Sequence, residues 1–278
     1  DLLGLSTLSM IEKCVENILK RHFDVESPTF SDIKKFYDYY LHPDVIDLKD
    51  QNVYEKVFHR GEWLGTFQYT QEGAQEFCTR VKPVNPIDNA IVTSIFRPGP
   101  LGAKVDSHFL KARKNPKSIE YLNDDHKEIA EETYGFLIFQ EQIALLAHKL
   151  GGLTLDEGNL LRKILTKKGT GKDSKRHKLK EKFVAGCQKN GIKKKDAEDM
   201  WGKFEYFSGY GFNKSHAVSY SIISFQCAWL WTYYPSEWAV AFLDKEPEAK
   251  KEKAISLVKS YGFEIEPVNI NKSGSSCE

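Results

Sequence analysis

The stretch YGFNKSHAVSY, residues 210–220, stands directly in front of a long apolar run that continues to Tyr233. Asn213 is a preferred helix N-cap, because its side-chain oxygen can accept a hydrogen bond from a first-turn N–H group. Lys214, Ser215 and His216 would then occupy that turn, where the helix dipole is positive. The pattern predicts either a phosphate-binding helix start or a capped core helix whose Lys and His face water.

The composition is that of a globular protein with a sizeable core. With 278 residues, 41% of them apolar, the chain can form one large or two ordinary domains. It has no apolar run of the roughly 20 residues that a membrane helix requires, and no basic-then-apolar leader. Its five cysteines are scattered without metal or disulfide spacing, so we expect neither a zinc site nor disulfides, and a cytoplasmic setting.

The net charge of +1 hides a strong asymmetry along the chain. Residues 162–195 contain fourteen Lys or Arg and only two acidic residues, a local charge of +12. A solvated helix face normally mixes both signs. This one-sided run therefore favours a polyanionic partner over simple solubility.

Two other motifs place cations beside sharp turns. Arg97 ends an apolar helical segment and is followed by Pro98-Gly99-Pro100, which either fixes the guanidinium in place or simply stops a helix beside a surface Arg. Further along, Gly151-Gly152 separates two amphipathic helices, the first with an apolar stripe of Ile138, Ile143, Leu146 and Leu150. The second helix begins near Leu155, carries Leu160, Leu161 and Ile164, and ends in a basic tip of Arg162, Lys163, Lys167 and Lys168. This arrangement predicts an αα-corner with a cationic end.

The letters GTGK at 169–172 do not form a phosphate loop. That loop would need a glycine at position 166 and Ser or Thr at 173, where Thr166 and Asp173 stand. An independent nucleotide-hydrolysing loop is therefore excluded.

Helical patterns dominate the rest of the chain. Residues 1–22 pass from a short apolar start into a helix with Leu8, Ile11, Val15, Ile18 and Leu19 on one face. A helix is also expected through 74–81, and two basic helices over 176–203 split near Gly191. Because strand-like alternation is scarce, the sequence predicts a mainly α fold.

Four motifs follow one another in a characteristic order and spacing: RPGPL at 97–101, TYGFLIFQEQ at 133–142, GGLTLDEGNLLRKILTKK at 151–168 and YGFNKSHAVSY at 210–220. Together they resemble the fingers domain of bacterial DNA polymerase III alpha subunits, the family C DNA polymerases. DLLGLSTL at 1–8 resembles the last palm strand and following helix of that family, and EPVNI at 266–270 resembles the segment leading to its clamp-binding region. The resemblance implies a palm end at 1–22, a large helical fingers domain at 23–250 and the start of the clamp-binding segment at 251–278.

The resemblance also implies roles for particular residues. Asp1 matches a metal-binding catalytic carboxylate of the nucleotidyltransferase-like palm. The residues matched to binding of nucleotide or DNA are Arg97, Gly99, Arg162, Lys163, Lys167, Lys168, Tyr210, Asn213, Lys214, His216 and Tyr220. Tyr220 would serve as a stacking or packing group. The chain departs from the bacterial pattern at Lys163, which replaces an arginine and loses its planar fork, as a phage-encoded polymerase could.

The activity implied is that of a DNA-directed DNA polymerase, which transfers deoxynucleotides to a primer 3′ end by two-metal phosphoryl transfer with Mg²⁺. The implied partners are template-primer DNA, deoxynucleoside triphosphates and, outside this segment, the sliding clamp and other replisome subunits in the cytoplasm of a bacterial cell or phage host. Because the chain starts at Asp1, without Met, we expect a segment of a longer protein that is inactive alone, for want of the other palm carboxylates. The alternative is a non-catalytic helical nucleic-acid-binding module, which the same basic run would favour.

Overall fold

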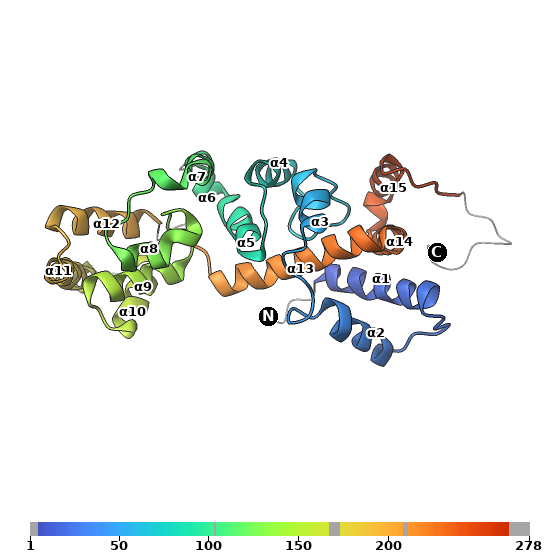
Figure 1. The fold of residues 1–278 in the computed structure, drawn as a ribbon, viewed down its shortest axis with the longest axis horizontal. Helices are drawn as coiled ribbons and strands as arrows, with labels where there is room; N and C mark the ends of the chain where they lie inside the picture. Colours follow the sequence, from blue (N-terminus) through green and yellow to red (C-terminus); the bar gives the residue numbers. More distant parts are fainter. Residues whose placement is uncertain (1–4, 103, 167–172, 208–210, 267–278) are drawn as a thin grey trace. The chain divides into compact units, whose positions relative to one another are not determined.

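The computed structural model describes residues 5–102, 104–166, 173–207 and 211–266, and its regular structure is helical (Figure 1). In these ranges there is no strand, and Phe139 and Phe212 form an isolated parallel bridge. The predicted mainly α fold is therefore confirmed. The palm strand expected at the start of the chain lies outside the described residues.

The chain divides into two compact units. Unit 1 combines residues 1–86 with 220–278, and unit 2 is the continuous segment 87–219. The domain limits expected from the resemblance, at 22 and 250, remain predictions. Within the described ranges, no helix is both long enough and apolar enough to cross a membrane.

Unit 1 is built from helices at both ends of the chain. Its elements are α1 (Ser6–His22), α2 (Phe30–Phe36), the π-helix η1 (Tyr37–Leu41), α3 (Gln51–Val53), the π-helix η2 (Tyr54–His59), α4 (Glu72–Val81), α14 (Pro235–Lys245), η5 (Glu248–Lys250) and α15 (Lys251–Ser260). The second part of α13 (Lys214–Tyr233) also belongs to it. Helix α1 packs beside α14 (Figure 1). The buried Trp238 of α14 donates its indole N–H to the Leu64 carbonyl at 2.6 Å, so its polar atom is satisfied inside the core.

Unit 2 contains the segments that carry most of the predicted site. Its elements are α5 (Pro86–Ile95), α6 (Pro98–Gly102), α7 (Val105–Lys114), η3 (Pro116–Ser118), α8 (Asp124–Ala130), η4 (Glu131–Thr133), α9 (Gln140–Gly151), α10 (Leu155–Thr166), α11 (Asp173–Lys189), α12 (Lys194–Phe207) and the first part of α13. Helices α9 to α12 form one bundle (Figure 1). Phe183, Trp201 and Phe204 are fully buried at its centre with ring centroids 5.2–6.1 Å apart.

The tandem glycines predicted to end a helix do so, and one of them also permits a close contact. Gly152 adopts a left-handed conformation, with φ of 63°, at the C-cap of α9, and α10 follows from Leu155. The predicted αα-corner is thus confirmed. Helix α11 crosses the end of α9 so closely that a Cβ on Gly186 would lie 1.8 Å from the Gly151 carbonyl oxygen.

The predicted elements differ from the structure at several boundaries. Helix α9 starts at Gln140, so Ile138 belongs to an extended segment instead of the helical stripe. RPGPL does not remain an irregular turn, because residues 98–102 form the short helix α6. Leu8 and Leu160, assigned to apolar stripes, are 48% and 39% exposed. Pro235 follows the end of α13 as predicted, but it also opens α14, because proline fits the first turn of a helix.

Candidate functional site

The start of α13 has the cap that the sequence predicts. The Asn213 side-chain oxygen accepts hydrogen bonds from the His216 backbone N–H at 2.8 Å and from the Ser215 hydroxyl at 2.7 Å. One of the free N–H groups of the first turn is thereby satisfied. The cap fixes the direction in which Lys214 and His216 leave the helix.

Two carboxylates of the chain surround the same helix start. Glu141 accepts from the Asn213 side-chain amide at 2.7 Å and from the Lys214 backbone N–H at 3.0 Å. The Lys214 ammonium lies 2.5 Å from a carboxylate oxygen of Glu132. The helix N-terminus, for which a phosphate-binding site was one of the two sequence-based alternatives, therefore already holds negative charge from Glu141.

The TYGFLIFQEQ motif holds this helix start through its backbone. The Phe212 N–H donates to the Ile138 carbonyl at 3.0 Å, and the Gln140 N–H donates to the Phe212 carbonyl at 2.9 Å. Residues 137–139 are extended, so their own N–H groups need partners outside a helix. The buried Gln142 supplies them, because its oxygen accepts from the N–H groups of Ile138 and Phe139 at 2.9 and 3.0 Å.

Arg97 reaches the same backbone stretch from the end of α5. Its guanidinium carbon lies 4.6 Å from the centroid of the Phe212 ring, a cation–π arrangement. The Phe212 ring also contacts His216, with centroids 5.6 Å apart. The Nη1 atom of Arg97 is buried and has no hydrogen-bond partner among the described residues. A buried donor of this kind is costly unless an acceptor reaches it.

Arg162 reaches the stretch from α10. Its Nη1 donates to the Gln140 side-chain oxygen at 3.0 Å, and the Gln140 amide nitrogen donates to the Gly211 carbonyl at 2.8 Å. Arg97 therefore contacts Phe212, and Arg162 is linked through Gln140 to the preceding residue, Gly211. The fold thus brings together two cations that lie 65 positions apart in the sequence.

A buried ion pair supports the α5 end of this arrangement. Arg113 on α7 donates to both carboxylate oxygens of Asp88 on α5, at 3.1 and 2.8 Å, and to the Tyr134 hydroxyl at 3.0 Å. Burial acts to lower the pKa of Arg113, but the hydrogen bonds and charge of Asp88 outweigh it and the pKa is raised overall. Arg113 therefore stays charged and ties α5 and α7 to the turn that follows η4.

Sequence reasoning missed several of these residues. Glu132, Gln140 and Glu141 surround the cations. Gln140 and Glu141 belong to the TYGFLIFQEQ motif, but neither was predicted to be a site residue. Asp88 and Arg113 gave no sequence signal, because a pair 25 positions apart matches no local spacing.

The remaining predicted residues are placed as follows. Lys163 is exposed on α10, and Gly99 lies in α6. Tyr220 belongs to unit 1, where its ring meets Phe67 edge to face at 5.2 Å, which favours the packing role over stacking on a base. Asp1, Lys167, Lys168 and Tyr210 lie outside the described residues. Within the described ranges, no group of three or more His, Cys, Asp or Glu side chains is arranged to hold a metal ion.

Comparison with known proteins adds a family to this geometry. Residues 7–191 match the model of the family described as the bacterial DNA polymerase III alpha subunit finger domain. The chain is similar to the DNA polymerase III subunit alpha of Campylobacter jejuni, with 34% identity over 275 residues. It is also similar to the subunits so named of Aquifex aeolicus and Escherichia coli K12, each with 32% identity. These alignments cover 98% of this chain but only 21–23% of each relative, so the chain spans about a fifth of their length.

Proposed function

Because the chain belongs to the bacterial DNA polymerase III alpha subunit finger-domain family, we propose that it binds the incoming deoxynucleoside triphosphate and the template-primer in a DNA-templated DNA polymerase. The polymerase would act in DNA replication in the bacterial cytoplasm, together with a clamp and other replisome subunits. The observation that carries the proposal is the convergence of Arg97 and Arg162 on Phe212 and Gly211. Arg97 also retains a buried N–H group without an acceptor among the described residues, as a phosphate site requires.

In this proposal the chain neutralises and positions the triphosphate. Arg97 donates to phosphate oxygens from a guanidinium that the Phe212 ring holds in place, and Arg162 approaches from α10. Lys214 joins them when its ammonium leaves Glu132. Positioning of this kind accounts for much of the rate enhancement in phosphoryl transfer, because the reaction needs little covalent chemistry from the protein.

The metal ions of this reaction class would activate the primer hydroxyl and stabilise the leaving pyrophosphate. The described residues do not form a metal centre. The magnesium ligands are proposed to be Asp1, outside the described residues, and carboxylates beyond this chain. We expect the 278-residue chain alone to show no primer extension with Mg²⁺.

The test is an Arg97→Ala substitution in the polymerase that contains this chain. We expect kcat/KM for nucleotide to fall about 100-fold, because the variant cannot make a charge-assisted hydrogen bond to the triphosphate, with duplex binding changed less than about two-fold. Arg80→Ala is the matched control, since Arg80 is a half-exposed arginine of α4 that should leave nucleotide kinetics unchanged. Unaltered kinetics in the Arg97 variant would overturn the proposal.

The second candidate is the non-catalytic nucleic-acid-binding module, which the exposed lysines of α11 and α12 favour. The two functions separate in an Asp1→Asn variant of the longer protein. A polymerase loses primer extension and keeps DNA binding. A binding module is unaffected in both measurements.

A further inference from the structure

Helix α7 has one exposed face on which the charged side chains are all basic. Lys104, His108, Lys111 and Lys114 follow one another at spacings of four, three and three residues, so they lie along one side of the helix. All four residues are exposed. The buried side consists of Val105, Phe109 and Leu110. Because a solvated helix face normally mixes both signs, a face of one sign requires a separate explanation.

The acids near α7 do not neutralise this face. Asp106 lies in the first turn, two positions after Lys104, and residues at that spacing do not share a side of a helix. Asp88 pairs with Arg113, which is partly buried on the side of α7 away from Lys104. In the part of the chain that the structure describes, Lys104, Lys111 and Lys114 form no ion pair.

Exposed lysines elsewhere in unit 2 are paired with acids of the chain. Lys127 of α8 lies 3.8 Å from Glu131, and Lys149 of α9 lies 3.7 Å from Asp125. The lysines of α7 differ from these in having no such neighbour among the described residues. Their positive charge is therefore directed to solvent without compensation.

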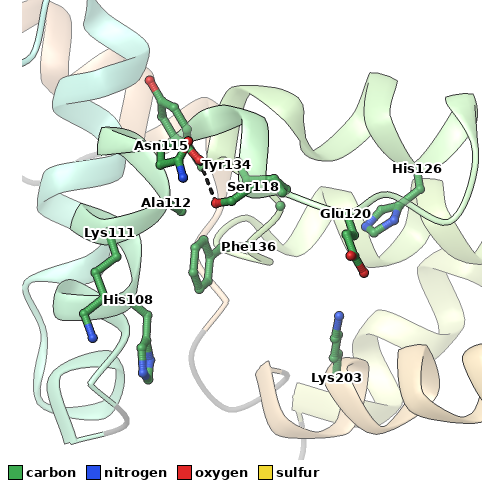
Figure 2. A pocket seen from close by; sticks show the side chains of 12 residues that line it. His108, Lys111, Ala112, Asn115, Ser118, Glu120, His126, Tyr134, Phe136 and Lys203 are labelled. Carbon is green, nitrogen blue, oxygen red and sulfur yellow. Dashed lines mark hydrogen bonds between the residues drawn. The ribbon is translucent and has the colours of Figure 1, made fainter.

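Figure 2 shows the middle of this face from close by. His108 and Lys111 lie on one side of Phe136, at the edge of a pocket of about 570 Å³. Glu120, the acid of the pocket wall, lies on the other side of Phe136, beside Lys203. The pocket therefore separates the basic face of α7 from the acid that it contains.

Helix stability accounts for only part of this face. Lys111 and Lys114 lie in the last turn of α7, where the helix dipole favours cations. Lys104 is the N-cap, where the dipole is positive and a cation is unfavourable. It also has φ of 55°, a left-handed conformation that is unfavourable for a residue other than glycine. Strained residues of this kind cluster at functional sites, which favours a binding role for Lys104.

We propose that this face of α7 binds the phosphate backbone of DNA. The ten positions from Lys104 to Lys114 extend about 15 Å along a helix, which matches about four successive phosphates of one strand. Lysine ammonium groups bind phosphate as point charges, and the His108 ring adds an N–H donor. A single strand and a duplex both supply this backbone. The proposal rests on the template-primer binding proposed above and assigns it to a surface outside the basic run at 162–195.

The test is a Lys104→Gln/Lys111→Gln double variant of the 278-residue chain, measured by fluorescence anisotropy with labelled DNA across a salt series. Loss of one lysine–phosphate contact lowers the slope of log Kd against log salt by about 0.9 for a duplex and about 0.7 for a single strand. We therefore expect the slope to fall by up to about 1.8 or 1.4, and Kd at 0.1 M salt to rise about five-fold or more.

The matched control is a Lys127→Gln/Lys149→Gln double variant. It removes two exposed lysines of the same unit, but both are already paired with acids of the chain, so the slope should change by less than about 0.5. Both double variants should unfold at the temperature of the wild type, because none of the four lysines is buried.

The two DNA probes identify the source of the backbone. A lower slope with the single strand alone assigns the face to an unpaired strand, and a lower slope with the duplex alone assigns it to double-stranded DNA. A lower slope with both assigns it to the backbone that they share. Equal slopes for the two double variants with both probes overturn the proposal, as does the absence of DNA binding by the wild type at about 50 mM salt.

The result is separable from the test of nucleotide binding. Arg97→Ala should leave both DNA slopes unchanged, because Arg97 is proposed to contact the triphosphate. If it lowers kcat/KM for nucleotide while the α7 double variant keeps the wild-type slopes, the proposed function stands without this surface. If the α7 slopes fall while the Arg97 variant keeps normal kinetics, the surface stands and the nucleotide site is overturned.

Discussion

Lys214 is one of the cations proposed to bind the triphosphate, and in this structure it is paired with carboxylates of the chain itself. Its ammonium meets Glu132, and both side chains are 34% exposed, so the ion pair is open to water and adds little to stability. Its backbone N–H is taken by Glu141, at the position where an anion would meet the helix dipole. A triphosphate that binds here has to compete with carboxylates of the protein, which weakens its binding and favours ligands of high charge.

The competition can be measured with a Glu132→Gln substitution. The variant keeps the shape of the side chain but frees the Lys214 charge, so we expect triphosphate affinity to rise about two- to five-fold. Stability should change by less than about 0.5 kcal/mol, because the exposed pair is screened by solvent. Titration of the chain with dATP checks this result. Glu131→Gln is the control, because Glu131 is the neighbouring acid and contacts Lys127 instead of Lys214. Lower or equal affinity in the Glu132 variant contradicts the competition.

His126 gives a pH dependence whose sign follows from its burial. Its folded pKa is about 4, below the value near 6.5 of an unfolded chain, so stability from the neutral ring is complete above the unfolded pKa. That stability decreases as pH falls from about 6.5 toward 4, by at most about 3 kcal/mol, because the unfolded state takes up the proton first. Urea unfolding of the wild type and of His126→Gln between pH 4.5 and 7.5 should show a smaller loss in the variant.

The His126 experiment has an internal control. Other groups that titrate in this window contribute equally to both proteins and cancel in the difference. His177→Gln is the matched control, because it removes a histidine of α11 whose side chain is 71% exposed. An NMR titration that places the pKa of His126 near 6.5 would rule out the expected difference.

At the scale of elements, the bundle of α9 to α12 depends on how closely two helices approach. Gly151 ends α9 and Gly186 lies in α11, and neither position has room for a Cβ. On Gly151 the added atom would lie 2.2 Å from a Phe183 ring carbon, and on Gly186 it would meet the Gly151 carbonyl. Because the obstacle at Gly186 is backbone, a larger residue has to separate the helices.

A Gly186→Ala substitution tests this close approach. We expect the free energy of unfolding to fall by about 3 kcal/mol, since overpacking outweighs the gain in helix propensity. Gly202→Ala in α12 is the matched control, because nothing lies within 4 Å of a Cβ there. That variant should be more stable by about 0.5–1 kcal/mol, the ordinary advantage of Ala over Gly inside a helix. The measurement is thermal and denaturant unfolding of both variants. If Gly186→Ala and Gly202→Ala changed the free energy of unfolding equally, the helices would not need the close approach.

Sequence reasoning found the elements whose signals are local. The cap at Asn213, the stop at Gly151-Gly152 and the division of the basic helices near Gly191 all depend on neighbouring residues, and all are present. The start of α9 could not be placed, because apolar residues such as Ile138 suit an extended segment as well as a helix. Residues 137–139 are extended because their backbone pairs with Phe212, a residue far along the chain.

Part of the site was predictable for the same reason. Arg97, Arg162 and Lys214 stood out by charge beside turn and cap signals. Their partners Gln140, Glu141 and Glu132 became meaningful only once the fold brought residue 212 beside residue 139. Glu132 and Glu141 reach the start of α13 only through long-range contacts, and no spacing rule in a single sequence reveals such contacts.

At the scale of the whole chain, the fold sorts charge between its two units. Unit 2 contains 24 Lys or Arg and 17 Asp or Glu. Unit 1 contains 16 Lys or Arg and 22 Asp or Glu. The net charges are therefore +7 and −6, and they cancel to the +1 of the complete sequence. The division could not be predicted from charge runs alone, because unit 1 joins segments from both ends of the chain. Polyanion binding is expected to depend on the cations of unit 2.

Duplex DNA binding by the chain should therefore depend on where lysines are removed and not only on how many. Changing Lys175, Lys178 and Lys189 of α11 to Gln removes three exposed cations of unit 2, and changing Lys250, Lys253 and Lys259 removes three of unit 1. Removal of one lysine–phosphate interaction lowers the slope of log Kd against log salt by about 0.9, so the α11 triple should lower it by up to about 2.7 and weaken binding about ten-fold or more at 0.1 M salt. The unit 1 triple should change the slope by less than about 0.5. Fluorescence anisotropy with a labelled duplex across a salt series measures both slopes. Equal slopes in the two triple variants would mean that overall charge governs the interaction, rather than the basic surface of unit 2.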